Sequence, residues 1–141
     1  MIRSLRYMLD TNTIIDAKNR RPPCVLERLL QHDPSEIAIS IITLAELEVG
    51  NFKSTNPIRN RMAMLMFLSK ITVLPFDVYA AFEYGDIRCK LEKQGMKIGG
   101  NDFLIAAHAK ALDLILVTNN TREFSRVERL KIENWNDMSS H

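Results

Sequence analysis

The sequence predicts an α/β protein with a doubly wound parallel sheet of four to five strands and helices on both faces. Short apolar stretches alternate with longer segments in which apolar residues recur at helical spacing. That alternation is typical of parallel strands joined by crossover helices. The 141 residues contain no repeat and no linker-like stretch, so we expect a single domain over residues 1–141.

The first expected strand is short. Leu5, Tyr7 and Leu9 alternate with Arg6 and Met8, which predicts that this strand is half-buried. Apolar runs rich in β-branched residues predict further strands at residues 37–42, 72–74 and 115–117, with a short fifth at 131–133. Helices are expected over residues 13–19, from the proline pair at 22–23 to a turn at 33–35, and over 43–50, 56–69, 77–94 and 103–112.

Local residues predict how several helices begin and pack. Thr43 and Glu46 have the spacing of a capping box, which would place Glu46 in the first turn of its helix. Asp77 is expected to cap the long helix, and Asn101 or Asp102 to open the alanine-rich one. The 56–69 helix carries a wide apolar stripe of Ile58, Met62, Leu65, Met66 and Leu68. Its Met62, Met64, Met66 and Phe67 are expected in the core or in a dimer interface.

Composition is that of an ordinary soluble globular protein, with 46% hydrophobic and 26% charged residues. No apolar run approaches the roughly 20 residues that a membrane span needs, and the N-terminus runs into the first strand without a signal peptide. Cys24 and Cys89 are expected to be reduced thiols in a cytoplasmic protein. A net charge of +2 is too small to indicate a nucleic-acid partner by itself.

Three acidic residues occupy equivalent places along the chain. Asp10 ends the first strand, and Glu46 and Asp102 lie in the first turns of helices. In a parallel α/β layer the carboxyl ends of strands and the amino ends of helices share one edge, where ligands bind. We therefore expect these three carboxylates to converge there, beside the polar residues Asn12, Thr118, Asn119 and Asn120.

Each acid also has a structural explanation. Asp10 and Asp102 are suitable helix caps, and Glu46 is suitable as the second half of the capping box. Three acids within reach of one another, however, raise each other's pKa and destabilise the fold. A hard cation relieves that conflict, and oxygen ligands without His or Cys favour Mg²⁺, with Mn²⁺ as an alternative.

A carboxylate-bound Mg²⁺ at such an edge is suited to phosphate chemistry. It can polarise a phosphoryl oxygen, lower the pKa of a water and offset charge on the leaving oxygen. Glu46 is the candidate to orient or deprotonate the water. Asn12, Thr118 and Asn120 are the candidates to position that water or the substrate phosphate.

Four segments together resemble the PIN-domain ribonucleases, and more closely the VapC toxins of bacterial toxin–antitoxin pairs. They are residues 8–12, 43–47, 99–102 and 117–124, which read Met-Leu-Asp-Thr-Asn, Thr-Leu-Ala-Glu-Leu, Gly-Gly-Asn-Asp and Val-Thr-Asn-Asn-Thr-Arg-Glu-Phe. The resemblance extends from the first strand to Trp135, which we expect to hold the last strand on the core.

The resemblance implies a PIN-like fold and a Mg²⁺-dependent endoribonuclease. It also implies a homodimer and inhibition by a cognate VapB-type antitoxin. It assigns Asp10, Glu46 and Asp102 as the catalytic acids, with Asp10 and Asp102 most directly on the metal. The last segment is similar to the subgroup that cuts initiator tRNA in the anticodon loop. Basic residues around the cleft would then hold the RNA backbone: Lys18, Arg20, Lys90, Lys93 and Lys97.

The chain departs from the family pattern at one position. Many PIN domains carry a fourth acid after the fourth strand, and this chain has Asn120 there. An amide binds a metal more weakly than a carboxylate, so the number of metal ions, one or two, stays open. Glu123, three residues later, is a candidate substitute.

Two alternatives to a nuclease remain at this point. Residues 10–13, Asp-Thr-Asn-Thr, resemble the Asp-x-Asp-x-Thr signature of haloacid dehalogenase-like phosphatases, but Asn12 replaces the second acid. The other alternative is a catalytically weak PIN-like binding module. His108 lies six residues after Asp102, about 600° of helical turn, so it is expected to face away from the acid as a packing or surface residue.

Overall fold

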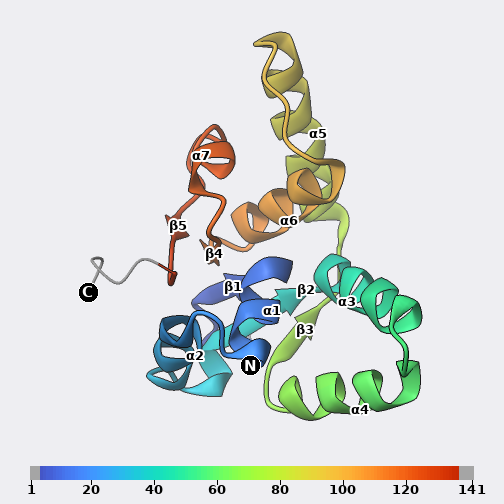
Figure 1. Ribbon diagram of the computed structural model, residues 1–141. Coiled ribbons are helices and arrows are strands. Elements are labelled where there is room, and N and C mark those ends of the chain that lie inside the picture. Colours follow the sequence, from blue (N-terminus) through green and yellow to red (C-terminus); the bar gives the residue numbers. More distant parts are fainter. Residues whose placement is uncertain (1–3, 137–141) are drawn as a thin grey trace.

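A computed structural model describes residues 4–136 of the chain (Figure 1). Its strands are β1 (Tyr7–Leu9), β2 (Ile37–Ser40), β3 (Thr72–Leu74), β4 (Ile115–Val117) and β5 (Ile132–Glu133). Its helices are α1 (Thr11–Asn19), α2 (Pro23–Leu30), the 3₁₀ turn η2 (Pro34–Glu36), α3 (Ile41–Lys53), α4 (Pro57–Phe67), α5 (Val78–Lys93), α6 (Gly100–Ala111) and α7 (Thr121–Phe124).

The five strands form one parallel sheet in the order β3-β2-β1-β4-β5. β1 is central, with Tyr7 paired to Ile37 of β2 and to Ile115 of β4. Because every strand runs the same way, all carboxyl ends meet at one edge. The predicted α/β class, strand number and parallel direction are confirmed.

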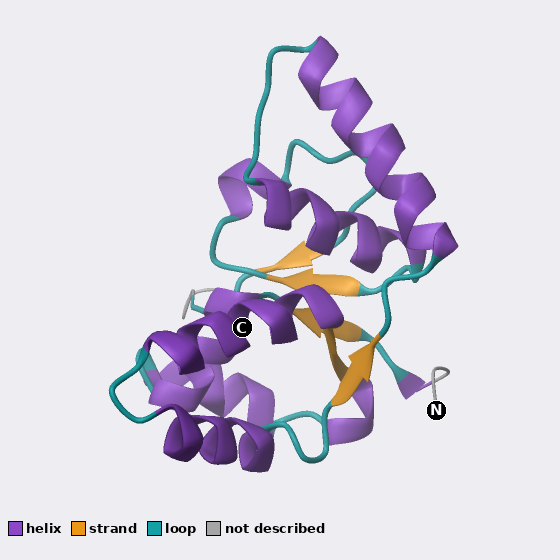
Figure 2. Cartoon of the chain, turned by 90° about the vertical axis from the view of Figure 1, so that its right-hand side faces the viewer, coloured by secondary structure: helices purple, strands orange, loops and turns teal. Residues whose placement is uncertain are grey.

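Helices cover both faces of this sheet, as predicted (Figure 2). One core cluster joins Met8 and Leu116 to residues of α5, α6 and α7, and the other joins Leu9 and Val117 to residues of α1, α2 and α4. The prediction of a half-buried β1 is wrong, because Tyr7, Met8 and Leu9 are all buried. A central strand covered on both faces buries its side chains in both directions.

The predicted boundary between β2 and α3 is also wrong. The strand ends at Ser40, whose hydroxyl accepts the backbone N–H of Ile42 at 3.0 Å and so caps α3. Thr43 is therefore inside the helix rather than at its cap. Glu46 is the sixth residue of α3, in its second turn rather than its first. The helix continues past Gly50 to Lys53.

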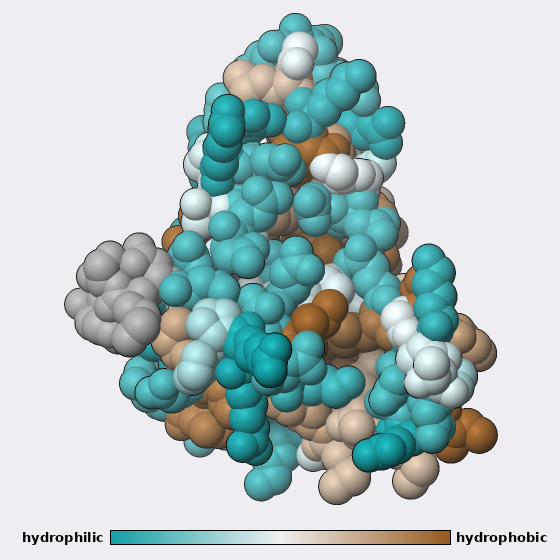
Figure 3. All heavy atoms as spheres, in the orientation of Figure 1, coloured by the Kyte–Doolittle hydropathy of each residue, from teal (hydrophilic) through white to brown (hydrophobic). Residues whose placement is uncertain are grey.

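The apolar stripe of α4 divides between core and surface. Met64 and the C-cap residue Leu68 are buried, and Phe67 packs partly buried against the core, whereas four other large apolar residues are exposed. These exposed residues are Ile58, Met62, Leu65 and Met66. Figure 3 shows apolar side chains at the lower right, in the region of α4. For Met62 and Met66 the expectation of a core position is wrong, and the dimer-interface alternative stays a prediction.

Other elements agree more closely with the sequence. β3 and β4 have the predicted bounds, and the Asp77 carboxylate caps α5 by accepting the Ala80 N–H at 3.0 Å. α6 begins at Gly100, slightly earlier than expected, with Gly99 at its N-cap, and the short helix α7 was not predicted. No helix within residues 4–136 has the length and apolarity to cross a membrane. The prediction that no signal peptide is present involves residues 1–3, which lie outside the described residues.

Trp135 holds the end of the chain against the sheet, as the sequence predicted. It is 1% exposed and belongs to the core cluster that includes Tyr7 and Leu29. Its ring stacks on His32 with centroids 5.3 Å apart, and its Nε1–H donates to Glu133 at 3.1 Å. The segment after β5 is therefore fixed by one large buried side chain.

Replacing Trp135 by Ala should lower the free energy of unfolding by about 3–5 kcal/mol, because it leaves a cavity and exposes apolar neighbours. Urea denaturation followed by circular dichroism measures the change. Met66→Ala is the control, since Met66 is 76% exposed and its truncation should change stability by less than about 0.5 kcal/mol. Equal effects of the two substitutions would contradict this role for Trp135.

Candidate active site

Asp10 lies at the carboxyl end of β1 and is 4% exposed. It is the N-cap of α1, and its Oδ1 accepts the backbone N–H of Thr13 at 2.8 Å. Burial raises the pKa of Asp10, while hydrogen bonds from Thr118 and Thr13 act in the opposite direction. The capping explanation is thus part of the structure, but it does not account for the cost of burying this carboxyl group.

Asp102 lies in the first turn of α6, and its side chain is partly buried. The N-cap of α6 is Gly99, and no side-chain hydrogen bond caps this helix. Asp102 is therefore not its cap. Its pKa is raised to about 6, first by burial and then by the charges of Asp10, Glu46 and Glu123. Four carboxyl groups distant in sequence therefore interact electrostatically at this edge of the sheet.

Glu46 is held by two neutral hydrogen-bond donors. The Thr11 hydroxyl donates to its Oε1, and the Asn101 side-chain amide donates to its Oε2 at 3.0 Å. These contacts connect α3 to the first turn of α1 and to the first turn of α6. Because Glu46 also lies in the second turn of α3, behind the N-cap Ser40, it is not part of a capping box. Neither Thr11 nor Asn101 was identified from the sequence as a site residue.

The segment after β4 supplies the remaining polar groups. Thr118 is buried, and its hydroxyl accepts the Asn120 N–H at 3.0 Å. The Asn120 amide donates to Glu123 Oε2 at 3.2 Å. Asn12, in contrast, is exposed in the first turn of α1. Thr118 therefore contacts Asp10 directly, whereas Asn120 contacts the candidate fourth acid.

The acids form a looser group than the sequence suggested. Within residues 4–136, no three Asp, Glu, His or Cys side chains are placed so that they could hold one metal ion together. A Mg²⁺ ion, however, usually takes one or two carboxylates and keeps several waters. The donors fit such an ion, because Asp10 and Asp102 are carboxylates whose pKa values are raised and whose charge a cation would stabilise.

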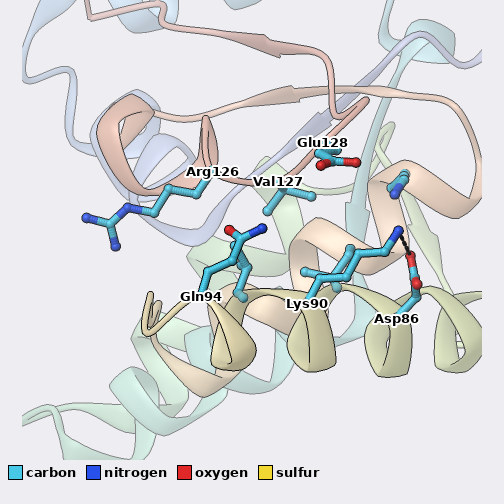
Figure 4. A pocket seen from close by; sticks show the side chains of 9 residues that line it. Asp86, Lys90, Gln94, Arg126, Val127 and Glu128 are labelled. Carbon is cyan, nitrogen blue, oxygen red and sulfur yellow. Dashed lines mark ion pairs between the residues drawn. The ribbon is translucent and has the colours of Figure 1, made fainter.

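A small pocket lies elsewhere, between α5 and the segment that follows α7 (Figure 4). Asp86 and Lys90 of α5 and Gln94, the C-cap of that helix, line one side of it, and Arg126 and Glu128 line the other. Lys90 forms an ion pair with Asp86 at 3.2 Å. None of the three predicted catalytic acids lines this pocket, so it is distinct from the acidic edge.

Comparison with known proteins identifies the family. The family model described as PIN domain matches residues 7–130. The chain is 47% identical over 131 residues to ribonuclease VapC2 of Haemophilus influenzae, covering 93% of this chain and 98% of that protein. It is 44% identical to the tRNA(fMet)-specific endonuclease VapC of Shigella flexneri, with the same coverage.

The chain belongs to the VapC ribonucleases of the PIN-domain family. A solved structure of VapBC2 from Rickettsia felis, bound to a DNA fragment from the promoter, agrees with this fold at a TM-score of 0.87. That similarity is at 42% identity and covers 93% of this chain and 99% of the other. The resemblance inferred from four short segments is confirmed, and with it the enzyme class. The catalytic roles of individual residues stay predictions.

Asp102→Asn should raise the stability of metal-free protein at pH 7.5 by about 1–2 kcal/mol, a value reduced for partial solvent screening. A pKa of about 6 for Asp102 in the folded state means that folding disfavours the ionised carboxylate, which is the form that predominates at pH 7.5. The wild-type protein takes up this proton on folding between pH 6 and 4, so its stability rises as pH falls.

Urea denaturation at pH 7.5 and pH 4 measures the effect, and the advantage of Asp102→Asn should disappear at the lower pH. Glu27→Gln, on the exposed side of α2, is the charge-matched control and should show no such advantage. A destabilised Asp102→Asn at pH 7.5 would show that the ionised carboxylate supports the fold.

Proposed function

We propose that this VapC protein is a Mg²⁺-dependent endoribonuclease that hydrolyses a phosphodiester bond in a single-stranded RNA loop. The observation that carries the proposal is that Glu46 bonds Thr11, the residue after Asp10, and Asn101, the residue before Asp102, so the three acids gather at the carboxyl edge of the sheet. Like charges at one ligand-binding edge destabilise the fold unless a cation binds there. Membership of a ribonuclease family supports the same chemistry and favours it over phosphatase activity.

The residues have distinct proposed roles. Asp10 and Asp102 hold the ion, which when bound would polarise the phosphate and lower the pKa of a water. Glu46, fixed by Thr11 and Asn101, orients the attacking water and accepts its proton. Thr118 and Asn120 position the water or the phosphate. Asn12 is proposed for the same role from the exposed first turn of α1.

Basic residues are proposed to hold the RNA backbone. Lys18 and Arg20 lie at the end of α1, and Lys93 and Lys97 lie at the end of α5 and in the following loop. Lys90 is paired with Asp86, so it contributes less free positive charge than the sequence suggested. Contacts of this kind depend on salt concentration and do not select a sequence.

We propose the anticodon loop of initiator tRNA as the substrate. Relatives in Shigella flexneri and Salmonella typhimurium, at 44% and 42% identity, are named tRNA(fMet)-specific endonucleases. Specific proteins read single-stranded RNA loops, because their bases are unstacked and accessible. The cytoplasm, expected from the sequence, is where such an RNA is found.

We also propose that a VapB-type antitoxin binds the protein. The similar structures from Rickettsia felis and Salmonella typhimurium are VapBC complexes. Exposed apolar side chains of α2 and α4, including Leu30, Met62 and Met66, are a surface that a protein partner would cover. The homodimer implied by the resemblance stays a prediction.

Asp10→Asn and Asp102→Asn should each reduce RNA cleavage by at least about 100-fold. Asn caps a helix as well as Asp does, so Asp10→Asn removes the charge while keeping the contact with Thr13. Incubation of purified protein with total RNA, with and without Mg²⁺, followed by mapping of the cut ends, measures the loss.

Glu27→Gln is the control and should cleave like the wild type. Normal cleavage by Asp10→Asn would show that Asp10 is only a cap and would refute the assignment. A wild-type protein that neither cleaves RNA nor binds Mg²⁺ in isothermal titration would support the binding-module alternative.

Initiator tRNA should be cut in its anticodon loop at least tenfold faster than elongator methionine tRNA, because loop-specific contacts add to uniform backbone binding. Single-turnover cleavage of the two transcripts at equal salt measures the ratio. Equal rates on both would leave the nuclease intact but remove the proposed tRNA specificity.

A further inference from the structure

His108 is a buried histidine of α6 that the proposed chemistry does not use. It is 1% exposed, and its Nδ1 lies 2.8 Å from the Ser40 hydroxyl. Its ring also contacts Phe76 edge-on, with centroids 5.4 Å apart. As predicted from the spacing, it is not on the Asp102 side of the helix. It joins α6 to the carboxyl ends of β2 and β3.

The hydrogen bond to Ser40 joins two neutral groups. The Ser40 oxygen accepts the Ile42 N–H and keeps one proton to donate and one lone pair to accept with, so it can bond either neutral tautomer of His108 through Nδ1. Burial lowers the pKa of His108, while the charge of Asp77 and the backbone of Pro75 act in the opposite direction. The neutral ring is therefore favoured.

Asn101 and His108 lie on the same face of α6. They are seven residues apart, about 700° of turn, which returns the second almost directly above the first at a separation of about 10 Å. Asn101 donates to Glu46 of α3, and His108 shares a hydrogen bond with Ser40, the last residue of β2 and the N-cap of α3. Two polar contacts therefore fix α6 against α3.

We propose that His108 is a positioning residue, which through Ser40 fixes the helix carrying Asp102 relative to the helix carrying Glu46. A neutral pair of this kind is short, buried and directional, so it sets the spacing of two carboxylates without adding charge to the acidic edge. The expected effect of His108 on RNA cleavage rests on the proposed nuclease function. Its expected effect on the position of α6 does not.

Two substitutions separate the hydrogen bond from packing. In His108→Asn, the amide oxygen and nitrogen are both as many bonds from Cβ as Nδ1 is, so a hydrogen-bond partner for Ser40 is retained in either direction. His108→Leu removes this partner but keeps apolar volume. With RNA at saturating Mg²⁺, His108→Leu should lower kcat about tenfold and leave KM within about twofold, whereas His108→Asn should recover most of kcat.

Leu91→Ala is the control for destabilisation alone. Leu91 is buried in α5, away from α3, and its truncation should lower stability but leave kcat per folded molecule unchanged. If His108→Leu keeps the wild-type kcat per folded molecule, as Leu91→Ala should, His108 is a packing residue and the proposal is overturned.

A measurement on metal-free protein separates this inference from the nuclease proposal. The ¹⁵N shifts of His108 should show a neutral ring near pH 7. The side-chain amide resonances of Asn101 should move in His108→Leu and stay in place in His108→Asn and Leu91→Ala. Unmoved Asn101 resonances in His108→Leu would overturn the positioning role, even if the wild type cleaves RNA. A wild type that fails to cleave RNA while these resonances move would refute only the nuclease function.

Discussion

The site is constrained by the repulsion of carboxylates that a parallel sheet brings to one edge. The cost is distributed unevenly. Asp10 and Glu46 are stabilised by neutral donors, from Thr13 and Thr118 for the first and from Thr11 and Asn101 for the second. For Asp102, burial and all the neighbouring charges that shift its pKa raise it. The pKa values of Asp10 and Asp102 are both raised, and a cation bound at this edge would relieve the cost of ionising them.

The same contacts that hold the acids also join the helices. Thr11 connects α1 to α3 through Glu46, and Asn101 connects α6 to α3 through the same side chain. Asn101 in this way joins α6, whose apolar residues belong to one core cluster, to α3, whose Leu44 and Leu47 pack against the other. Stability and catalytic geometry thus depend on shared residues at this edge.

The fold and two of its strand boundaries could be predicted from local pattern, but other boundaries could not. Residues 72–74 and 115–117 are short β-branched runs between turn residues, and both are strands as predicted. The predicted end of the strand at 37–42 was wrong, because Ile41 and Ile42 continue an apolar pattern that fits either a strand or a buried helix. Ser40 ends the strand, and its hydroxyl bonds His108, a contact across 68 residues that no local window contains.

The acids could be predicted from their place after strands and before helices, but the residues that hold them could not. Thr11 and Asn101 lie 35 and 55 residues from Glu46, and neutral side chains have no pattern that reveals such partners. The role of Asn120 was equally hard to predict. In the sequence it stands where many PIN domains have a fourth acid, so it indicates that this acid is lost. In the structure its amide holds Glu123, whose charge acts on Asp102, so the edge retains four interacting carboxyl groups although that position has lost its own.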